Sequence, residues 1–106
     1  MKEKNLDICI LFDYYGALLG NNRRQAVDLY YNEDWSLAEI AEHLGISRQG
    51  VRDLIKHGEA NLYEYEQKLC LVQKANKARQ ALTEIIGISD NAQVKALAGE
   101  LLEKCL

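Results

Sequence analysis

Residues 36–55 read SLAEIAEHLGISRQGVRDLI and carry the spacing of a helix-turn-helix. Ser36 is followed three residues later by Glu39, a capping box that predicts the start of the first helix. Gly45 supplies a turn residue that accepts positive φ, and the small Ala41 permits a close crossing of two helices. Apolar residues fall where such a crossing must be filled, at Ile40, Leu44, Ile46, Val51, Leu54 and Ile55. The stretch therefore predicts two short-linked helices that cross.

The second helix of this motif carries the candidate contacts with nucleic acid. If it enters a major groove, its N-terminal and outward positions meet the base edges. Arg can pair with guanine, Gln with adenine and Asp with cytosine, while Ser at a helix start suits a phosphate. These candidate nucleic-acid-binding residues are Ser47, Arg48, Gln49, Arg52, Asp53 and Lys56. The alternatives are a motif that binds only protein and a solvated helix face.

The charge is acidic overall but not along this helix. Thirteen Lys and Arg stand against 16 Asp and Glu, a net charge of -3. Residues 47–80 hold seven basic and four acidic side chains, a local charge of +3. Nucleic-acid binding is therefore not excluded, although a protein partner stays an alternative.

The composition favours helices throughout the chain. No proline occurs in 106 residues, and the seven glycines are scattered. A multi-stranded fold needs turn residues about every 8–12 positions. The predicted fold class is all-α, a helix-turn-helix bundle with a long helical C-terminal extension. We expect a helix-turn-helix domain over 1–58 and a helical extension over 59–106. Expected helices cover 6–19, 22–32, 37–44, a stretch from 47 to 86, and 91–104.

The stretch 47–86 is too long to be covered by a compact domain of this size. As one helix it would run about 60 Å at 1.5 Å per residue, against a radius of gyration of roughly 13 Å. We therefore expect either a break, near Gly58 or Ala75–Asn76, or a partner along its apolar heptad seam. The predicted homodimer seam consists of Leu62, Tyr65, Leu69 and Val72. The alternative is that this seam packs onto residues 6–31.

Several site classes are not expected. The three cysteines are odd in number, none lies in Cys-x-x-Cys spacing, and neither histidine is near one, which argues against a disulfide framework or a metal site. No nucleophile, oxyanion site or phosphate loop is recognisable, so no enzyme activity and no cofactor are expected. The longest apolar run, Ile8–Phe12, is too short for a membrane span. We expect a cytoplasmic protein.

Two family resemblances bear on function. The run from Trp35 to Ile55 resembles region four of bacterial sigma factors, which binds the −35 promoter element through its recognition helix. The resemblance covers Ser47, Arg48 and Arg52. It fails at Gln49 and Asp53, where sigma factors usually carry Glu and Gln, so promoter specificity does not carry over.

A resemblance over nearly the whole chain is to the YlxM family of small helix-turn-helix proteins from Gram-positive bacteria. It rests on the segments 29–31, 36–41, 46–51 and 63–69, and it fails at Gly20–Asn22 and Gly50. Genes of that family commonly neighbour those for signal recognition particle components. The resemblance implies a DNA-binding regulator of signal recognition particle genes. The alternative is an accessory protein that binds the particle's RNA or its GTPase.

Overall fold

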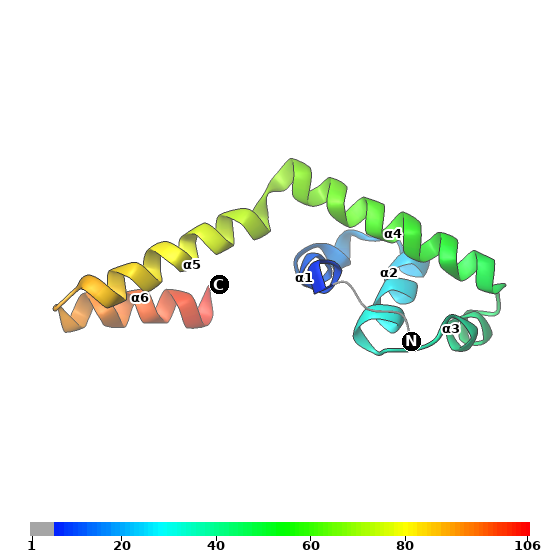
Figure 1. The fold of residues 1–106 in the computed structure, drawn as a ribbon, viewed down its shortest axis with the longest axis horizontal. Helices are drawn as coiled ribbons and strands as arrows, with labels where there is room; N and C mark the ends of the chain where they lie inside the picture. The colour runs from blue at the N-terminus through cyan, green and yellow to red at the C-terminus, as the bar shows by residue number, and fades with distance from the viewer. Residues whose placement is uncertain (1–5) are drawn as a thin grey trace. The chain divides into compact units, whose positions relative to one another are not determined.

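A computed structural model describes residues 6–106, and these residues fold entirely into helices and their connections (Figure 1). They form two compact units, one ending at Leu69 and the other covering Cys70–Leu106. The first unit contains α1 (Leu6–Tyr15), α2 (Asn21–Val27), α3 (Leu37–Leu44) and α4 (Arg48–Leu69). A 3-10 turn over Gly16–Leu18 follows α1, and a π-helical turn over Asp28–Asn32 extends α2. The second unit contains α5 (Leu71–Ile88) and α6 (Ala92–Lys104). The all-α fold is thus confirmed.

The core of the first unit joins the helix-turn-helix to the two helices that precede it. Its central cluster draws on α2, the π-helical turn, α3 and α4, and consists of Ala26, Tyr30, Ile40, Ala41, Val51 and Ile55. Further along, α4 packs on α1 and α2. Ile8, Tyr15, Val27 and Leu62 are almost completely buried there. The apolar residues expected at the helix crossing therefore fill it, except Ile46, which is 41% exposed.

The predicted turn chemistry is present in α3. The Glu39 backbone N–H donates to Ser36 Oγ at 3.1 Å, and the Ser36 N–H donates back to Glu39 Oε1 at 2.9 Å. Gly45 has φ +70°, and the Ile46 N–H donates to the Ala41 carbonyl at 3.0 Å. This last bond closes the C-terminal end of the helix as in a Schellman motif. Both ends of α3 are thus fixed by local bonds.

The long helix does not break where we expected. α4 continues through Gly58, and Ala75–Asn76 lies inside α5. The break occurs at Cys70, which takes the left-handed conformation with φ +56°. Gly58 lies inside the helix, and its missing side chain lets α2 pack closely. A Cβ there would lie only 2.6 Å from Val27 Cγ2 of α2. The glycine therefore marks a close approach of two helices and not a bend.

The first unit also extends further than residue 58, the boundary expected from the sequence. The Tyr15 hydroxyl of α1 donates to Glu66 Oε1 of α4 at 2.6 Å. The Tyr65 hydroxyl donates to the Leu18 carbonyl at 3.4 Å. These bonds tie the C-terminal half of α4 to the first helix and its 3-10 turn.

The predicted dimer seam is not a continuous surface. Leu62 is 0% exposed inside the first unit, and the Tyr65 ring lies 6.0 Å from the Tyr15 ring, centroid to centroid. Leu69 is exposed, but the helix ends after it, and Val72 belongs to α5 in the second unit. The four residues therefore do not lie on a single helix. Leu62 and Tyr65 pack on the N-terminal helices, as the alternative anticipated.

Candidate nucleic-acid interface

The helix-turn-helix presents the N-terminal half of α4 to solvent. The Gly50 N–H donates to Ser47 Oγ at 3.0 Å, so Ser47 caps α4. Val51 and Ile55 point into the core, which orients the opposite side outward. All six predicted site residues lie on this exposed side: Ser47, Arg48, Gln49, Arg52, Asp53 and Lys56. The structure brings them together along three turns of one helix.

Two of the candidate base-reading side chains are bonded to each other. Gln49 Nε2 donates to Asp53 Oδ1 at 3.1 Å, an i,i+4 pair on the exposed face. Bidentate pairing of Gln with adenine uses both the amide N–H and the amide oxygen. Gln49 must therefore release Asp53 before it can pair with adenine in that way. Arg48, Arg52 and Lys56 are the cations of this face.

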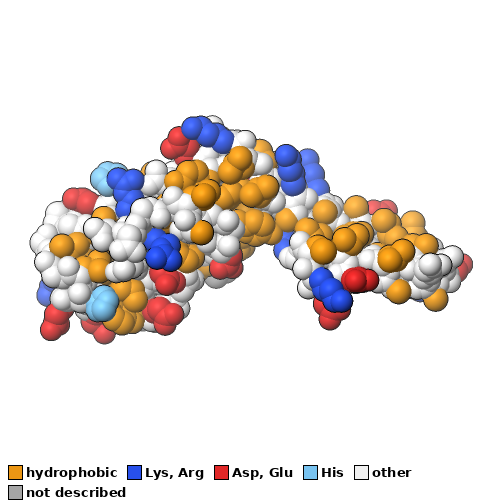
Figure 2. Space-filling view, turned by 180° about the vertical axis from the view of Figure 1, so that it is seen from behind, with side chains coloured by type: hydrophobic (Ala, Val, Ile, Leu, Met, Phe, Trp, Pro, Cys, Tyr) orange, Lys and Arg blue, Asp and Glu red, His pale blue; other side chains and the backbone are white. Residues whose placement is uncertain are grey.

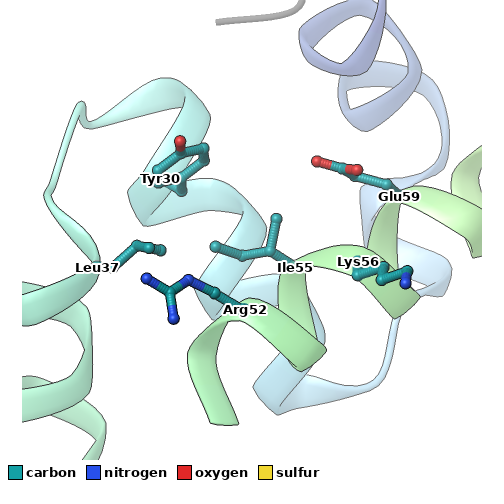
Figure 3. A pocket seen from close by; sticks show the side chains of 6 residues that line it. All are labelled: Tyr30, Leu37, Arg52, Ile55, Lys56 and Glu59. Carbon is teal, nitrogen blue, oxygen red and sulfur yellow. The ribbon is translucent and has the colours of Figure 1, made fainter. Parts of the chain in front are cut away.

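A groove runs beside α4 on the side of α3. Its volume is about 260 Å³, and it is lined by Tyr30, Leu37, Arg52, Ile55, Lys56 and Glu59 (Figure 3). The Arg52 side chain extends toward Leu37 at the start of α3, whereas Lys56 extends the opposite way along α4. Apolar Ile55 lies between Arg52 and Lys56, and Leu37 lies beyond Arg52. The groove could take a flat or extended group held by a cation at its edge.

The acid in this groove is held by a tyrosine. The Tyr31 hydroxyl donates a short hydrogen bond to Glu59 Oε1. Burial, followed by this bond and the charge of Glu59, raises the pKa of Tyr31 above its usual range. The phenol therefore stays protonated and keeps the Glu59 carboxylate bound. Glu59 therefore already has a hydrogen-bond donor within the protein.

A further cation, missed by the sequence analysis, lies on another side of α4. A hollow of about 570 Å³ is lined by Gly20, Asn21, Asn22, Arg23 and Leu54. Arg23 Nη1 donates to Asn61 Oδ1 of α4 at 2.7 Å, and the neighbouring Arg24 is exposed. The basic pair 23–24 was visible in the sequence, but its closeness to Leu54 depends on how α2 packs on α4. These arginines add positive charge outside the recognition helix.

The first helix of the motif is acidic on its surface. Glu39 and Glu42 of α3 are exposed, as are Glu33 and Asp34 just before it. The bonds from Ser36 lower the pKa of Glu39, so that acid stays ionised. On the face shown in Figure 2, acidic side chains are interspersed with basic ones over the first unit. The candidate interface is thus a basic stripe on α4 flanked by acids, and not a broad basic surface.

Two further kinds of site concern the described part of the chain, metal sites and membrane-spanning helices. Within residues 6–106 no three His, Cys, Asp or Glu side chains are grouped to hold a metal ion. Over the same range no helix combines the length and the apolar character that crossing a membrane requires.

Comparison with known proteins fixes the family. A family model described as "UPF0122: Putative helix-turn-helix protein, YlxM / p13 like" matches residues 2–101. The chain belongs to this YlxM/p13-like family. A UPF0122 protein of Desulforamulus reducens is 43% identical over 104 residues, which cover 98% of this chain and 87% of the relative. The resemblance to the YlxM family inferred from the sequence is confirmed.

Other YlxM/p13-like relatives match over somewhat shorter stretches. A UPF0122 protein of Acetivibrio thermocellus is 48% identical over 90 residues, covering 81% of this chain and 77% of the relative. One from a Geobacillus species is 46% identical over 85 residues, covering 80% and 77%. Membership in a helix-turn-helix family, together with the exposed row on α4, supports a DNA-binding role.

Proposed function

We propose that this YlxM-family protein is a DNA-binding regulator that reads duplex DNA with α4, and that its targets are genes of the signal recognition particle. The proposed DNA binding rests on one observation, the exposed row of Arg48, Arg52 and Lys56 on the second helix of the motif. The gene targets are proposed from the family resemblance alone. Few cations are available, so we expect modest affinity with a strong salt dependence.

The test combines fragment selection with a point variant. Purified protein should enrich a common motif from genomic fragments, and Arg52→Ala should weaken binding to that motif by about 5- to 150-fold, the loss of one base contact. Lys68→Ala is the matched control, because Lys68 lies on the same helix, is exposed and pairs with Glu64 at 2.8 Å. It should change affinity less than twofold. No enriched motif together with an unchanged Arg52→Ala would refute the proposal.

The salt dependence gives an independent measure of the contact. The logarithm of the binding constant should fall linearly with the logarithm of salt concentration, with a slope of about −0.9 per neutralised phosphate. Lys56→Ala should reduce the steepness by about one such unit if Lys56 meets a phosphate. An unchanged slope would remove Lys56 from the interface.

The second candidate function is an accessory protein of the signal recognition particle that binds its RNA or its GTPase. The acidic surface of α3 favours its protein branch, the GTPase, because the first helix of a helix-turn-helix bound to nucleic acid crosses the phosphate backbone. Glu42→Lys distinguishes binding to a nucleic acid from binding to a basic protein surface. The added positive charge should strengthen DNA or RNA binding, but it should weaken binding to a basic protein surface. Binding assays with the purified particle RNA and GTPase then decide between the partners.

We also propose that the regulator acts as a homodimer. A two-fold pair could place two recognition helices about 34 Å apart, one turn of DNA. The selected motif should then contain two related half-sites.

A further inference from the structure

The second unit buries too little for a stable domain. α5 and α6 run back along each other, joined by the short connection 89–91 (Figure 1). Among the side chains of this unit, only Ala75 and Ala98 are buried. Its larger apolar side chains Val72, Leu82, Ile86 and Leu102 are only half-buried, so the two helices lack the buried apolar core that small domains need. Further apolar burial must therefore come from outside the hairpin.

The hairpin carries large apolar side chains on its surface instead. Val94 is 39% exposed, Leu97 59% and Leu101 47%, and their spacing of three and four residues places them on one face of α6. Ile85 and Ile88 are 38% and 75% exposed near the end of α5 that leads into α6. We call these five residues the hairpin face. Figure 2 shows hydrophobic side chains gathered over this unit.

The size of the hairpin suits one kind of occupant. α5 has 18 residues and is about 27 Å long at 1.5 Å per residue. Two adjacent helices about 10 Å wide give roughly 500 Å² of flat area, which side-chain ridges enlarge. Specific interfaces begin at roughly 600 Å² per partner. An equal hairpin laid on this face therefore comes close to the area that a specific interface needs.

A second copy of the chain meets these requirements best. If the hairpin face must be buried for the hairpin to fold, its partner must be present wherever the protein is synthesised. Another copy of the same chain always meets this condition. Two hairpins joined about a two-fold axis make a four-helix bundle, in which each copy presents the same face. We propose that the protein dimerises through the hairpin face. This rests on the homodimer in the proposed function but not on DNA binding.

The hairpin face replaces the seam expected from the sequence. Leu62 is buried and Tyr65 packs on Tyr15 within the first unit, so neither is needed for the dimer. None of the five hairpin-face residues belongs to the α3–α4 motif. Dimerisation and DNA binding therefore use different residues and can fail separately.

The test is sedimentation velocity on the full-length protein from about 1 to 100 μM. The natural chain should sediment as a dimer, and Leu97→Glu should raise the dimer dissociation constant by about 100-fold or more, since it puts a charge into an apolar interface. Leu18→Glu is the matched control, because Leu18 is 57% exposed in the first unit. It should leave the dimer intact. Arg52→Ala should also leave it intact, which separates this test from that of DNA binding.

A second measurement guards against a variant that simply unfolds. Leu97→Ala keeps helix propensity and should weaken the dimer by a smaller factor with unchanged circular dichroism at high concentration. Cross-links between light and isotope-labelled natural chains should join Lys104 of one copy to α6 of the other. A natural chain that is a folded monomer at 100 μM would overturn the proposal. So would a dimer that resists Leu97→Glu but dissociates with Leu69→Glu.

Discussion

Gly58 sets the distance between α2 and α4. A Cβ at this position would lie 2.6 Å from Val27 Cγ2, inside the contact limit of two carbon atoms, and both residues are buried. Gly58→Ala should therefore destabilise the protein by about 1–2 kcal/mol, because overpacking of about 1–3 kcal/mol exceeds the gain in helix propensity of about 1 kcal/mol. Urea unfolding followed by circular dichroism measures the change.

The matched control for that substitution is Gly99 in α6. Apart from its chain neighbours and the backbone of its own helix, no atom lies within 4 Å of a Cβ built there. Gly99→Ala should therefore be neutral or stabilising by up to about 1 kcal/mol. Equal effects at both positions would mean that helix propensity alone accounts for Gly58.

Tyr31 gives the first unit a dependence on alkaline pH. Burial, the bond to Glu59 and the charge of Glu59 raise the pKa of this phenol. The unfolded chain loses the proton near pH 10, whereas the folded chain keeps it to higher pH. The stabilisation is thus complete below pH 10 and is lost as pH rises, by at most about 1.4 kcal/mol per unit. Tyr31→Phe should flatten this decline between pH 10 and 11, and Glu59→Gln should do so in part. Identical pH profiles of all three proteins would contradict the assignment.

At the scale of elements, the helix-turn-helix could be predicted because its ends are set by neighbouring residues. The capping box of Ser36 and the left-handed Gly45 act within a few positions of the chain. The end of α4 could not be predicted, since Cys70 is neither Gly nor Asn and no proline follows it. The groove beside α4 could not be predicted from the sequence either, because Tyr30 and Lys56 are brought to the same groove only by packing. Local chemistry is visible in the sequence, whereas contacts between distant residues are not.

Cys70 adopts a backbone conformation that favours glycine. At φ +56° a side chain meets its own carbonyl, which costs roughly 1–2 kcal/mol. Cys70→Gly should relieve this cost but add entropy to the unfolded chain, giving a net stabilisation of up to about 1 kcal/mol. Cys70→Val should destabilise by about 1–2 kcal/mol, because β-branched residues fit this region worst. Thermal unfolding of both variants provides the comparison. A gain from valine would indicate that the connection between α4 and α5 is not left-handed in solution.

At the scale of the whole molecule, the net charge of -3 divides unevenly between the two units. The unit from Cys70 to Leu106 holds five basic and four acidic side chains, so the surplus of acid lies in residues 1–69. The same first unit contains the basic row on α4. Steering of an anionic partner must therefore come from a local stripe, which explains why we expect modest affinity. Total charge alone would have pointed away from nucleic acid.

The two units should also differ in how their stability depends on protein concentration. The first has a buried core of large side chains, including Ile40, Val51 and Leu62, that does not require a partner. The second buries only Ala75 and Ala98, so the proposed dimer must supply the rest of its core. Binding that involves only the folded state stabilises by mass action. Amide protection in α5 and α6 should therefore rise as protein concentration increases, while protection in α3 and α4 stays constant.

Hydrogen exchange with mass spectrometry at about 1 and 100 μM measures this difference peptide by peptide. This roughly 100-fold rise in concentration predicts a gain in α5–α6 protection of up to about 10-fold, since the monomer fraction of a dimer falls at most as the square root of its total concentration. In Leu97→Glu the gain should vanish, and the first unit should keep its protection because its core contains no hairpin residue. If α5 and α6 of Leu97→Glu are as strongly protected at about 1 μM as those of the natural chain are at about 100 μM, the hairpin is stable by itself. Its exposed leucines and isoleucines would then not be a dimer interface required for folding.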